Sequence, residues 1–185
     1  ADSGWLKPFL HTWSLSVEEQ YYILFPIILL LIAKYLRQYL FPTLIFGFIA
    51  CLILAEWGSR NYPSFNFYSL PTRGWELLAG SILAYFEITR GYRNKQKLMN
   101  SILPSIGILM IAHSIIYFDD SMFHPSFFTL SPIIGVCLII WFSDKDELIT
   151  KILSSKIFVG VGLISYSLYL WHYPILSFAR ITEFT

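Results

Sequence analysis

Three polar clusters interrupt an otherwise apolar sequence, and the first of them, HTWSLSVEEQYY, spans residues 11–22. It holds two adjacent carboxylates, Glu18 and Glu19, just before a long apolar run. A carboxylate at the entrance to a membrane can act as a general acid or base, so both are candidate catalytic groups. A structural alternative is that Ser16 and Glu19 form a capping box at the start of a helix. Three more side chains of this cluster are candidates for binding substrate: His11, Trp13 and Ser14.

The second cluster, LPTRGWELLAG, spans residues 70–80 and contains an arginine and a glutamate three positions apart. Arg73 and Glu76 can pair on one face of a helix. A purely structural explanation is a local ion pair beside Trp75, with Trp75 as an aromatic anchor at the membrane interface. The functional alternative uses the planar guanidinium of Arg73 to bind a phosphate or a carboxylate. On that alternative, Arg73 and Glu76 are candidate substrate-binding residues.

The third cluster, GLISYSLYLWHYP, spans residues 162–174. Ser165, Tyr169 and His172 follow one another at intervals of four and three residues, so one helix face would present a hydroxyl, a phenol and an imidazole. A single histidine near a helix end is often held by a backbone carbonyl. Ionisable residues inside a membrane span are nevertheless functional candidates, because placing them there costs free energy. We therefore expect His172 to be catalytic, and Ser165 and Tyr169 to bind substrate.

The elements that carry these clusters are predicted to be transmembrane helices. Of the 185 residues, 56% are hydrophobic and 14% are charged, whereas soluble domains average about 45–50% and about 25%. One core of this size cannot bury so much apolar surface, so we expect an all-α fold, a polytopic helix bundle in the lipid bilayer. A net charge of +1 gives no basic surface for nucleic acid. The histidines have no metal-binding spacing and no nucleotide-binding motif is present, so neither a metal nor a bound cofactor is expected.

Six stretches approach the roughly 20 apolar residues that cross a bilayer. They are residues 17–34, 40–57, 75–89, 101–118, 126–142 and 157–178. Nine of the 13 Lys and Arg residues fall in the loops on one side, which predicts the cytoplasmic side. The N-terminus and the first two clusters then face outward. His172 also reaches the outer face, because it lies 16 residues beyond cytoplasmic Lys156, or about 24 Å along a helix. We expect all three clusters to line one cavity.

The three clusters also resemble motifs of a known family. HTWSLSVEEQYY at residues 11–22, TRGWELLAG at 72–80 and ISYSLYLWHYP at 164–174 are similar, in this order, to motifs of the bacterial acyltransferase 3 family of integral-membrane acyltransferases. The resemblance implies transfer of an acyl group, commonly acetyl, from an acyl-CoA-type donor as co-substrate. It implies as acceptor a hydroxyl on a cell-surface glycan, such as lipopolysaccharide O-antigen or peptidoglycan. The implied location is the bacterial cytoplasmic (inner) membrane.

The resemblance covers the later part of a family domain that has about ten transmembrane helices. The earlier part of that domain carries a basic segment and a histidine taken to be the catalytic base, for which residues 1–185 have no counterpart. We therefore expect a partial domain, inactive alone and completed by the missing N-terminal helices or by another subunit. In such a domain Glu18 or Glu19 would orient or assist the base. Arg73 would fix an anionic group of the donor or acceptor. His172 and Tyr169 would hydrogen-bond the acceptor or hold the cavity.

Two other classes of function remain open from the sequence. A transporter or flippase would also need a polar cavity that opens outward, although the inverted pair of broken helices typical of transporters is not recognisable. A non-catalytic membrane partner of another chain would explain the short length. An acyltransferase is the function predicted from the three clusters and the resemblance together.

Overall fold

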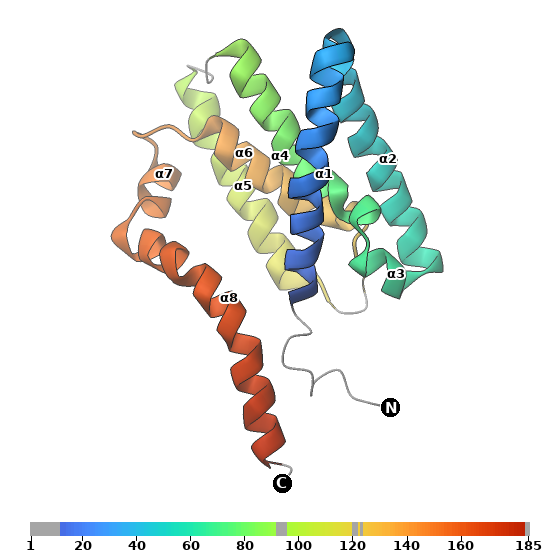
Figure 1. Cartoon of the computed structure of the whole chain (residues 1–185). Helices are drawn as coiled ribbons and strands as arrows, with labels where there is room; N and C mark the ends of the chain where they lie inside the picture. The colour runs from blue at the N-terminus through green and yellow to red at the C-terminus, as the bar shows by residue number, and fades with distance from the viewer. Residues whose placement is uncertain (1–11, 92–95, 120–121, 123, 184–185) are drawn as a thin grey trace.

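The computed structural model describes residues 12–91, 96–119, 122 and 124–183, and all regular secondary structure in these ranges is helical (Figure 1). The all-α fold class predicted from the composition is therefore confirmed. In chain order the elements are α1 (Trp13–Tyr35), η3 (Arg37–Tyr39), α2 (Leu40–Asn61), α3 (Pro63–Tyr68), α4 (Leu70–Arg90), α5 (Lys97–Tyr117), η4 (Phe127–Thr129), α6 (Leu130–Phe142), α7 (Leu148–Leu153) and α8 (Lys156–Glu183).

Three stretches in the described part of the chain are long and apolar enough to cross a membrane: Trp13–Tyr35, Arg37–Asn61 and Lys97–Tyr117. A shorter apolar helix covers Phe127–Phe142. Many large apolar side chains on these helices point outward, and Leu30, for example, is 69% exposed. In a bilayer such side chains face lipid, and the helical backbone satisfies its own hydrogen bonds. These features are those of a membrane protein, while the count of six spans and the partial domain stay predictions.

Local sequence explains where α1 and α4 begin and end. α1 starts at Trp13 without a side-chain cap, so Ser16 lies inside the helix and the predicted capping box is wrong. α4 starts at Leu70, upstream of the predicted boundary, because Pro71 fits the first turn, where a helix needs no backbone donor. α4 ends at Gly91, whose φ of 66° is a left-handed conformation that favours glycine.

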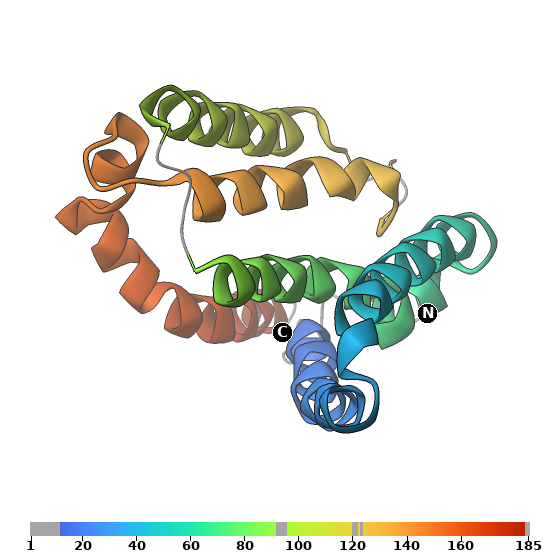
Figure 2. The same ribbon diagram turned by 90° about the horizontal axis from the view of Figure 1, so that it is seen from above.

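The helices are arranged around α4, which makes α4 the central element of the bundle. Figure 2 shows α6 between α5 and α4, with α2 and α1 on the other side of α4. α4 contacts α1, α2, α3 and α6. α8 packs against α7, and in Figure 1 its C-terminal half runs away from the bundle. The helix that carries Arg73 is therefore supported from several sides.

A cluster of buried apolar side chains lies between α2 and α4. Leu52 and Ala55 of α2 pack against Trp75 of α4, which is 0% exposed. The ring of Phe48 meets the indole edge-on, with centroids 6.0 Å apart. The interfacial position considered for Trp75 is therefore wrong, because its indole points into the α2–α4 contact. Trp75 instead fixes the rotation of α4, and with it the direction of the neighbouring Arg73.

α5 and α6 approach each other closely at a pair of glycines. A Cβ atom on Gly107 would lie 2.5 Å from the carbonyl oxygen of Gly135, and one on Gly135 would lie 2.6 Å from the carbonyl oxygen of Gly107. Only glycine allows two backbones to come this close, and small residues commonly serve this purpose between membrane helices. The pair therefore sets the distance between α5 and α6.

Candidate functional site

The first two polar clusters meet at a small cavity between the first turns of α1 and α4, which lie at the same end of the bundle (Figure 1). The cavity has a volume of about 80 Å³. Its lining residues are Trp13, Ser14, Val17, Glu18, Arg73, Glu76 and Leu77. Two segments far apart in the sequence thus place a carboxylate, a hydroxyl and a guanidinium around one space. We call this space the polar cavity.

Two kinds of contact hold Arg73 in the polar cavity. Its Nη2 atom lies 3.6 Å from Oε2 of Glu76, with 24% and 22% of the two side chains exposed, so the ion pair predicted from the spacing is present. Its guanidinium carbon lies 4.8 Å from the ring centre of Trp13 and 5.3 Å from that of Phe67, which are cation–π contacts. The ion pair is longer than a charge-assisted hydrogen bond of about 2.7–2.9 Å. The guanidinium therefore keeps donors for an anionic ligand.

Aromatic rings from α3 complete the surroundings of Arg73. The ring centroid of Trp13 lies 4.3 Å from that of Phe67 and 5.3 Å from that of Tyr68. Phe67 and Tyr68 are not among the site residues predicted from the sequence. The sequence feature from which they could have been predicted is the aromatic run FNFYS between Pro63 and Pro71. Such a run beside a motif arginine indicates stacking partners for it.

Tyr169 connects the third cluster to the first. The hydroxyl of Tyr169 in α8 lies 2.5 Å from Oγ of Ser14 in α1, across 155 positions of sequence. The hydrogen bond brings α8 to the edge of the polar cavity. Tyr169 itself does not line the polar cavity, so the expectation that all three clusters line one cavity stays a prediction.

The other two residues of the third cluster contact their own helix. Ser165 is exposed and donates to the carbonyl oxygen of Gly162 at 2.7 Å. His172 is also exposed, and its Nδ1 lies 3.1 Å from the carbonyl oxygen of Leu168, one turn earlier. Neither residue lines the polar cavity. A catalytic role of His172 and a binding role of Ser165 stay predictions.

The residues predicted in the first cluster differ in whether they line the polar cavity. Trp13, Ser14 and Glu18 line the polar cavity, as described above. Glu19 is exposed, does not line the cavity and forms no salt bridge within the described residues. His11 lies outside the described residues. The catalytic roles of Glu18 and Glu19 stay predictions, and Glu18 is the carboxylate that lies near Arg73.

A buried asparagine, which was not predicted from the sequence, connects the elements around the start of α4. Asn66 in α3 is fully buried, and its Nδ2 donates to the carbonyl oxygens of Ala55 at 3.1 Å and Pro125 at 3.4 Å. The backbone carbonyl oxygen of Asn66 accepts a hydrogen bond of 2.5 Å from the hydroxyl of Thr72, the residue before Arg73. A Cβ atom on Gly58 would lie 2.3 Å from Oδ1 of Asn66, so this position has room only for glycine. Asn66 thus ties α2, α3, the start of α4 and the loop before α6 together.

A second missed residue, Glu56, joins α2 to the segment before α6. Its Oε1 accepts hydrogen bonds from Nε of Arg60 at 2.9 Å and from Nη2 at 2.5 Å. Its Oε2 accepts the backbone N–H of Phe127 at 3.0 Å. The carboxylate therefore holds η4 against the end of α2 that also carries Asn66's partner Ala55. No local pattern reveals this role, because Phe127 is 71 positions away.

The chemistry available at the polar cavity is that of protein side chains. Within the described ranges, no group of three or more His, Cys, Asp and Glu side chains could hold a metal ion. A fixed guanidinium beside a carboxylate and two hydroxyls can bind an anionic or hydroxyl-rich ligand. The same carboxylate can accept or relay a proton from such a ligand.

Comparison with known proteins gives the family. Residues 2–182 match the family described as an acyltransferase domain, acyltransferase 3. The peptidoglycan O-acetyltransferase OatA of Listeria monocytogenes is 29% identical to the chain over 188 residues, which cover 94% of this chain and 30% of that protein. The O-acetyltransferase OatA of Staphylococcus aureus is 31% identical over 194 residues, covering 95% of this chain and 30% of that protein.

No solved structure matches the chain. The chain spans about 30% of the length of these two curated relatives. The family match, in contrast, extends over nearly all of its residues and includes all three polar clusters. The chain therefore belongs to the acyltransferase 3 family.

Proposed function

We propose that this chain forms the outward-facing part of an O-acyltransferase embedded in the bacterial cytoplasmic membrane. In this proposal an acetyl group passes from an acyl-CoA-type donor to a hydroxyl of a cell-surface glycan. Membership of the acyltransferase 3 family and relatives named O-acetyltransferases support it. One of these relatives has peptidoglycan in its name, and peptidoglycan is the acceptor that we propose first. The observation that carries the proposal is the polar cavity, where residues from two separate motifs meet and where Tyr169 of the third motif is hydrogen-bonded to the lining residue Ser14.

The reaction would proceed by attack of the glycan hydroxyl on the thioester carbonyl carbon. A carbon–oxygen bond forms, the carbon–sulfur bond breaks, the hydroxyl proton passes to a base, and the leaving thiolate takes up a proton. Such a step needs a base and hydrogen-bond donors that stabilise the oxyanion. In our proposal Glu18 or Glu19 orients or assists a base from another part of the domain. That part is supplied by further helices of the same protein or by another subunit.

The remaining residues of the site would hold the two substrates. Arg73 binds an anionic group of the donor or acceptor, because its planar fork of donors suits phosphate and carboxylate. Glu76 and Trp13 keep the guanidinium in place. Tyr169 and His172 hydrogen-bond the acceptor hydroxyls in this proposal.

Replacement of Arg73 in a full-length parent protein tests the proposed function. We expect R73A to lower O-acetylation of the cell-surface glycan by about 10²-fold, the scale for removal of one electrostatic donor in a catalytic site. R73K should restore activity only in part, because lysine keeps the charge but has no planar fork. Mass spectrometry of glycan fragments released from cells measures the acetyl content.

The matched control is R60A at the same end of the bundle. Arg60 is paired with Glu56 and is 66% exposed, and it does not line the polar cavity. We expect R60A to retain most of the acetylation. Full acetylation in R73A cells, with both variants inserted in the membrane at equal levels, would contradict the proposed function.

A further inference from the structure

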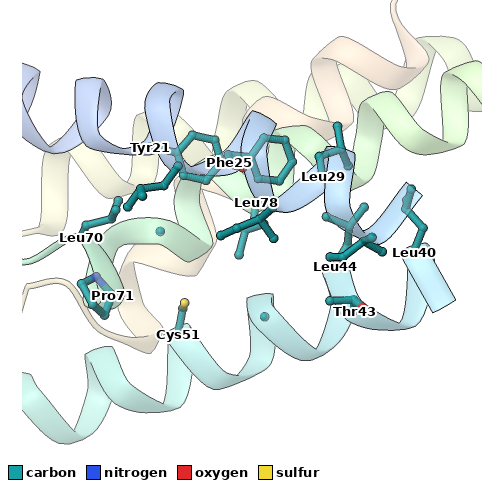
Figure 3. Close-up of a pocket in the computed structure, with 15 residues that line it drawn as sticks. Tyr21, Phe25, Leu29, Leu40, Thr43, Leu44, Cys51, Leu70, Pro71 and Leu78 are labelled. Carbon is teal, nitrogen blue, oxygen red and sulfur yellow. The ribbon is translucent and has the colours of Figure 1, made fainter. Parts of the chain in front are cut away.

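A long apolar slot runs along the side of α1 that faces α2 and α4 (Figure 3). It consists of a cavity of about 290 Å³ and an adjoining one of about 550 Å³. The two cavities adjoin each other, because Phe25, Leu29, Leu40 and Leu44 line both of them. Figure 3 shows Tyr21, Phe25 and Leu29 of α1 directed toward the side chains of α2 and α4. We call this space the α1 slot.

The walls of the α1 slot offer almost nothing to a polar ligand. The hydroxyl of Tyr21 is hydrogen-bonded to Oγ of Ser81 at 2.8 Å. Thr43 donates to the carbonyl oxygen of Tyr39 at 2.8 Å, and Thr89 donates to that of Tyr85 at 2.7 Å. These lining hydroxyls are therefore engaged within the protein, and the rest of the wall is mainly aliphatic and aromatic. Such a surface favours hydrocarbon, since burial of a polar ligand group without a partner costs free energy.

One end of the α1 slot differs from the rest. Arg37 is the charged residue among those that line it, and it is exposed at the start of η3, at the end of α1 opposite to the polar cavity. Arginine offers several donors to a phosphate. From Tyr21 to Tyr35, where α1 ends two residues before Arg37, the slot follows 14 residues of helix, or roughly 21 Å of helix rise. A hydrocarbon-lined space of this length with a cation at one end is complementary to an anionic amphiphile.

The surroundings identify the class of amphiphile. α1 and α2 lie in two of the three stretches that are long and apolar enough to cross a membrane, so the α1 slot would lie at the depth of the hydrocarbon core. The molecules there that combine a long apolar chain with a phosphate are phospholipids. A transmembrane helix is a poorer occupant, because a helix about 10–12 Å in diameter that runs the length of the slot has a larger volume than the two cavities together.

We propose that the α1 slot is a binding site for one membrane phospholipid, with an acyl chain between α1, α2 and α4 and the phosphate at Arg37. The site is separate from the polar cavity and does not depend on the proposed acetyl transfer. A bound lipid of this kind would fill the space between α1, α2 and α4. It would thereby stabilise the position of the helix that carries Arg73.

Photo-crosslinking to the full-length protein tests this site. The protein is placed in vesicles that contain phosphatidylglycerol with a diazirine near the end of one acyl chain, and labelled peptides are mapped by mass spectrometry. We expect labels on residues that line the slot, such as Tyr21, Phe25 and Leu78. L29W should remove most of this labelling, because Leu29 lines both cavities and the larger indole fills the space. L30W is the matched control, since Leu30 is the next residue and points outward.

The charged end is tested with R37A and with K34A as its control, since Lys34 lies near the same end of α1 but does not line the slot. Native mass spectrometry of the protein in detergent micelles measures how much phosphatidylglycerol stays bound. We expect R37A to weaken the binding of this lipid by about tenfold. K34A should change it little. L29M, which keeps the volume, should label like the parent and shows whether a loss in L29W is a folding defect.

Two outcomes would overturn the proposal. Equal labelling of the outer and inner faces of α1, unchanged by L29W, would mean that lipid only surrounds the protein. No labelling of the slot, together with a disulfide between L29C and a cysteine introduced in another helix of the full-length protein, would mean that a protein segment covers it. Neither outcome affects the R73A result, so the two proposals can fail independently.

Discussion

At the scale of single residues, the two adjacent carboxylates of α1 have different surroundings. Both side chains are exposed, but Glu18 lines the polar cavity with Arg73, whereas Glu19 does not. One position along a helix is a rotation of about 100°, which is enough to put neighbours on different faces. A substrate held by Arg73 would therefore meet Glu18. Glu19 faces whatever packs on the other side of α1.

The pair of carboxylates gives a direct comparison of these two faces. In a full-length parent, we expect E18Q to lower glycan O-acetylation by roughly 10²-fold, the lower end for loss of an acid–base group. E19Q should lower it less, because its side chain does not reach the polar cavity. Mass spectrometry of released glycan measures both, and protease accessibility of the loops controls for insertion. A greater loss in E19Q would instead place the reacting groups on the other face of α1.

The residues of the site were predictable from the sequence to the extent that their chemistry is local. The Arg73–Glu76 pair follows from a spacing of three on a helix, and the structure contains it. Asn66 was not predictable, because its partner Pro125 comes from a segment that only the fold brings near. Trp75 was misplaced for a related reason. A tryptophan near a helix end suits both an interface and a core, and only its contact with α2 decides between them.

At the scale of elements, apolar runs predict where the helices lie but not how they pack. The long runs correspond to α1, α2, α5 and α8, and the short third run proved to be the C-terminal part of α4. Which helix contacts which depends on side-chain shape across the interface. The glycine contact between α5 and α6 is such a feature, because each glycine looks unremarkable in its own run.

Substitution of Gly107 tests the packing of α5 on α6. In G107A the new methyl group would lie 2.5 Å from a backbone oxygen of α6, which cannot rotate away, so the helices must separate. We expect a loss of about 1–3 kcal/mol in the free energy of unfolding, measured by thermal or denaturant titration in micelles. G160A in α8 is the control, since a Cβ atom there has nothing within 4 Å. A stability in G107A equal to that in G160A would be inconsistent with the close approach.

At the scale of the whole molecule, the arrangement combines a central bundle with an outlying helix. α4 is held by α1, α2, α3 and α6, whereas α8 packs on α7 and reaches α1 through Tyr169. The third motif therefore approaches the site on an element that is less firmly packed than those that carry the first two. Composition predicted a helical membrane protein correctly. It could not predict this unequal packing, which depends on contacts between distant segments.

Removal of the Tyr169 hydroxyl tests how α8 is attached. We expect Y169F to weaken the docking of α8 by about 0.5–1.5 kcal/mol, the net contribution of one hydrogen bond. Spin labels on α8 and α1 of the full-length protein should then show a broader distribution of distances. Y166F is the control on the same helix, because Tyr166 is 59% exposed. An unchanged distribution in Y169F would show that other contacts alone place α8.

The clamping of Arg73 between rings and a carboxylate has a thermodynamic consequence for any anion that binds there. A free arginine side chain has roughly 2 kcal/mol of rotamer entropy to lose when it is immobilised. In this molecule much of that loss has already occurred on folding, because Trp13, Phe67 and Glu76 confine the guanidinium. Recognition then requires little further ordering, so each hydrogen bond formed contributes more fully to affinity. The site is preorganised before its ligand arrives.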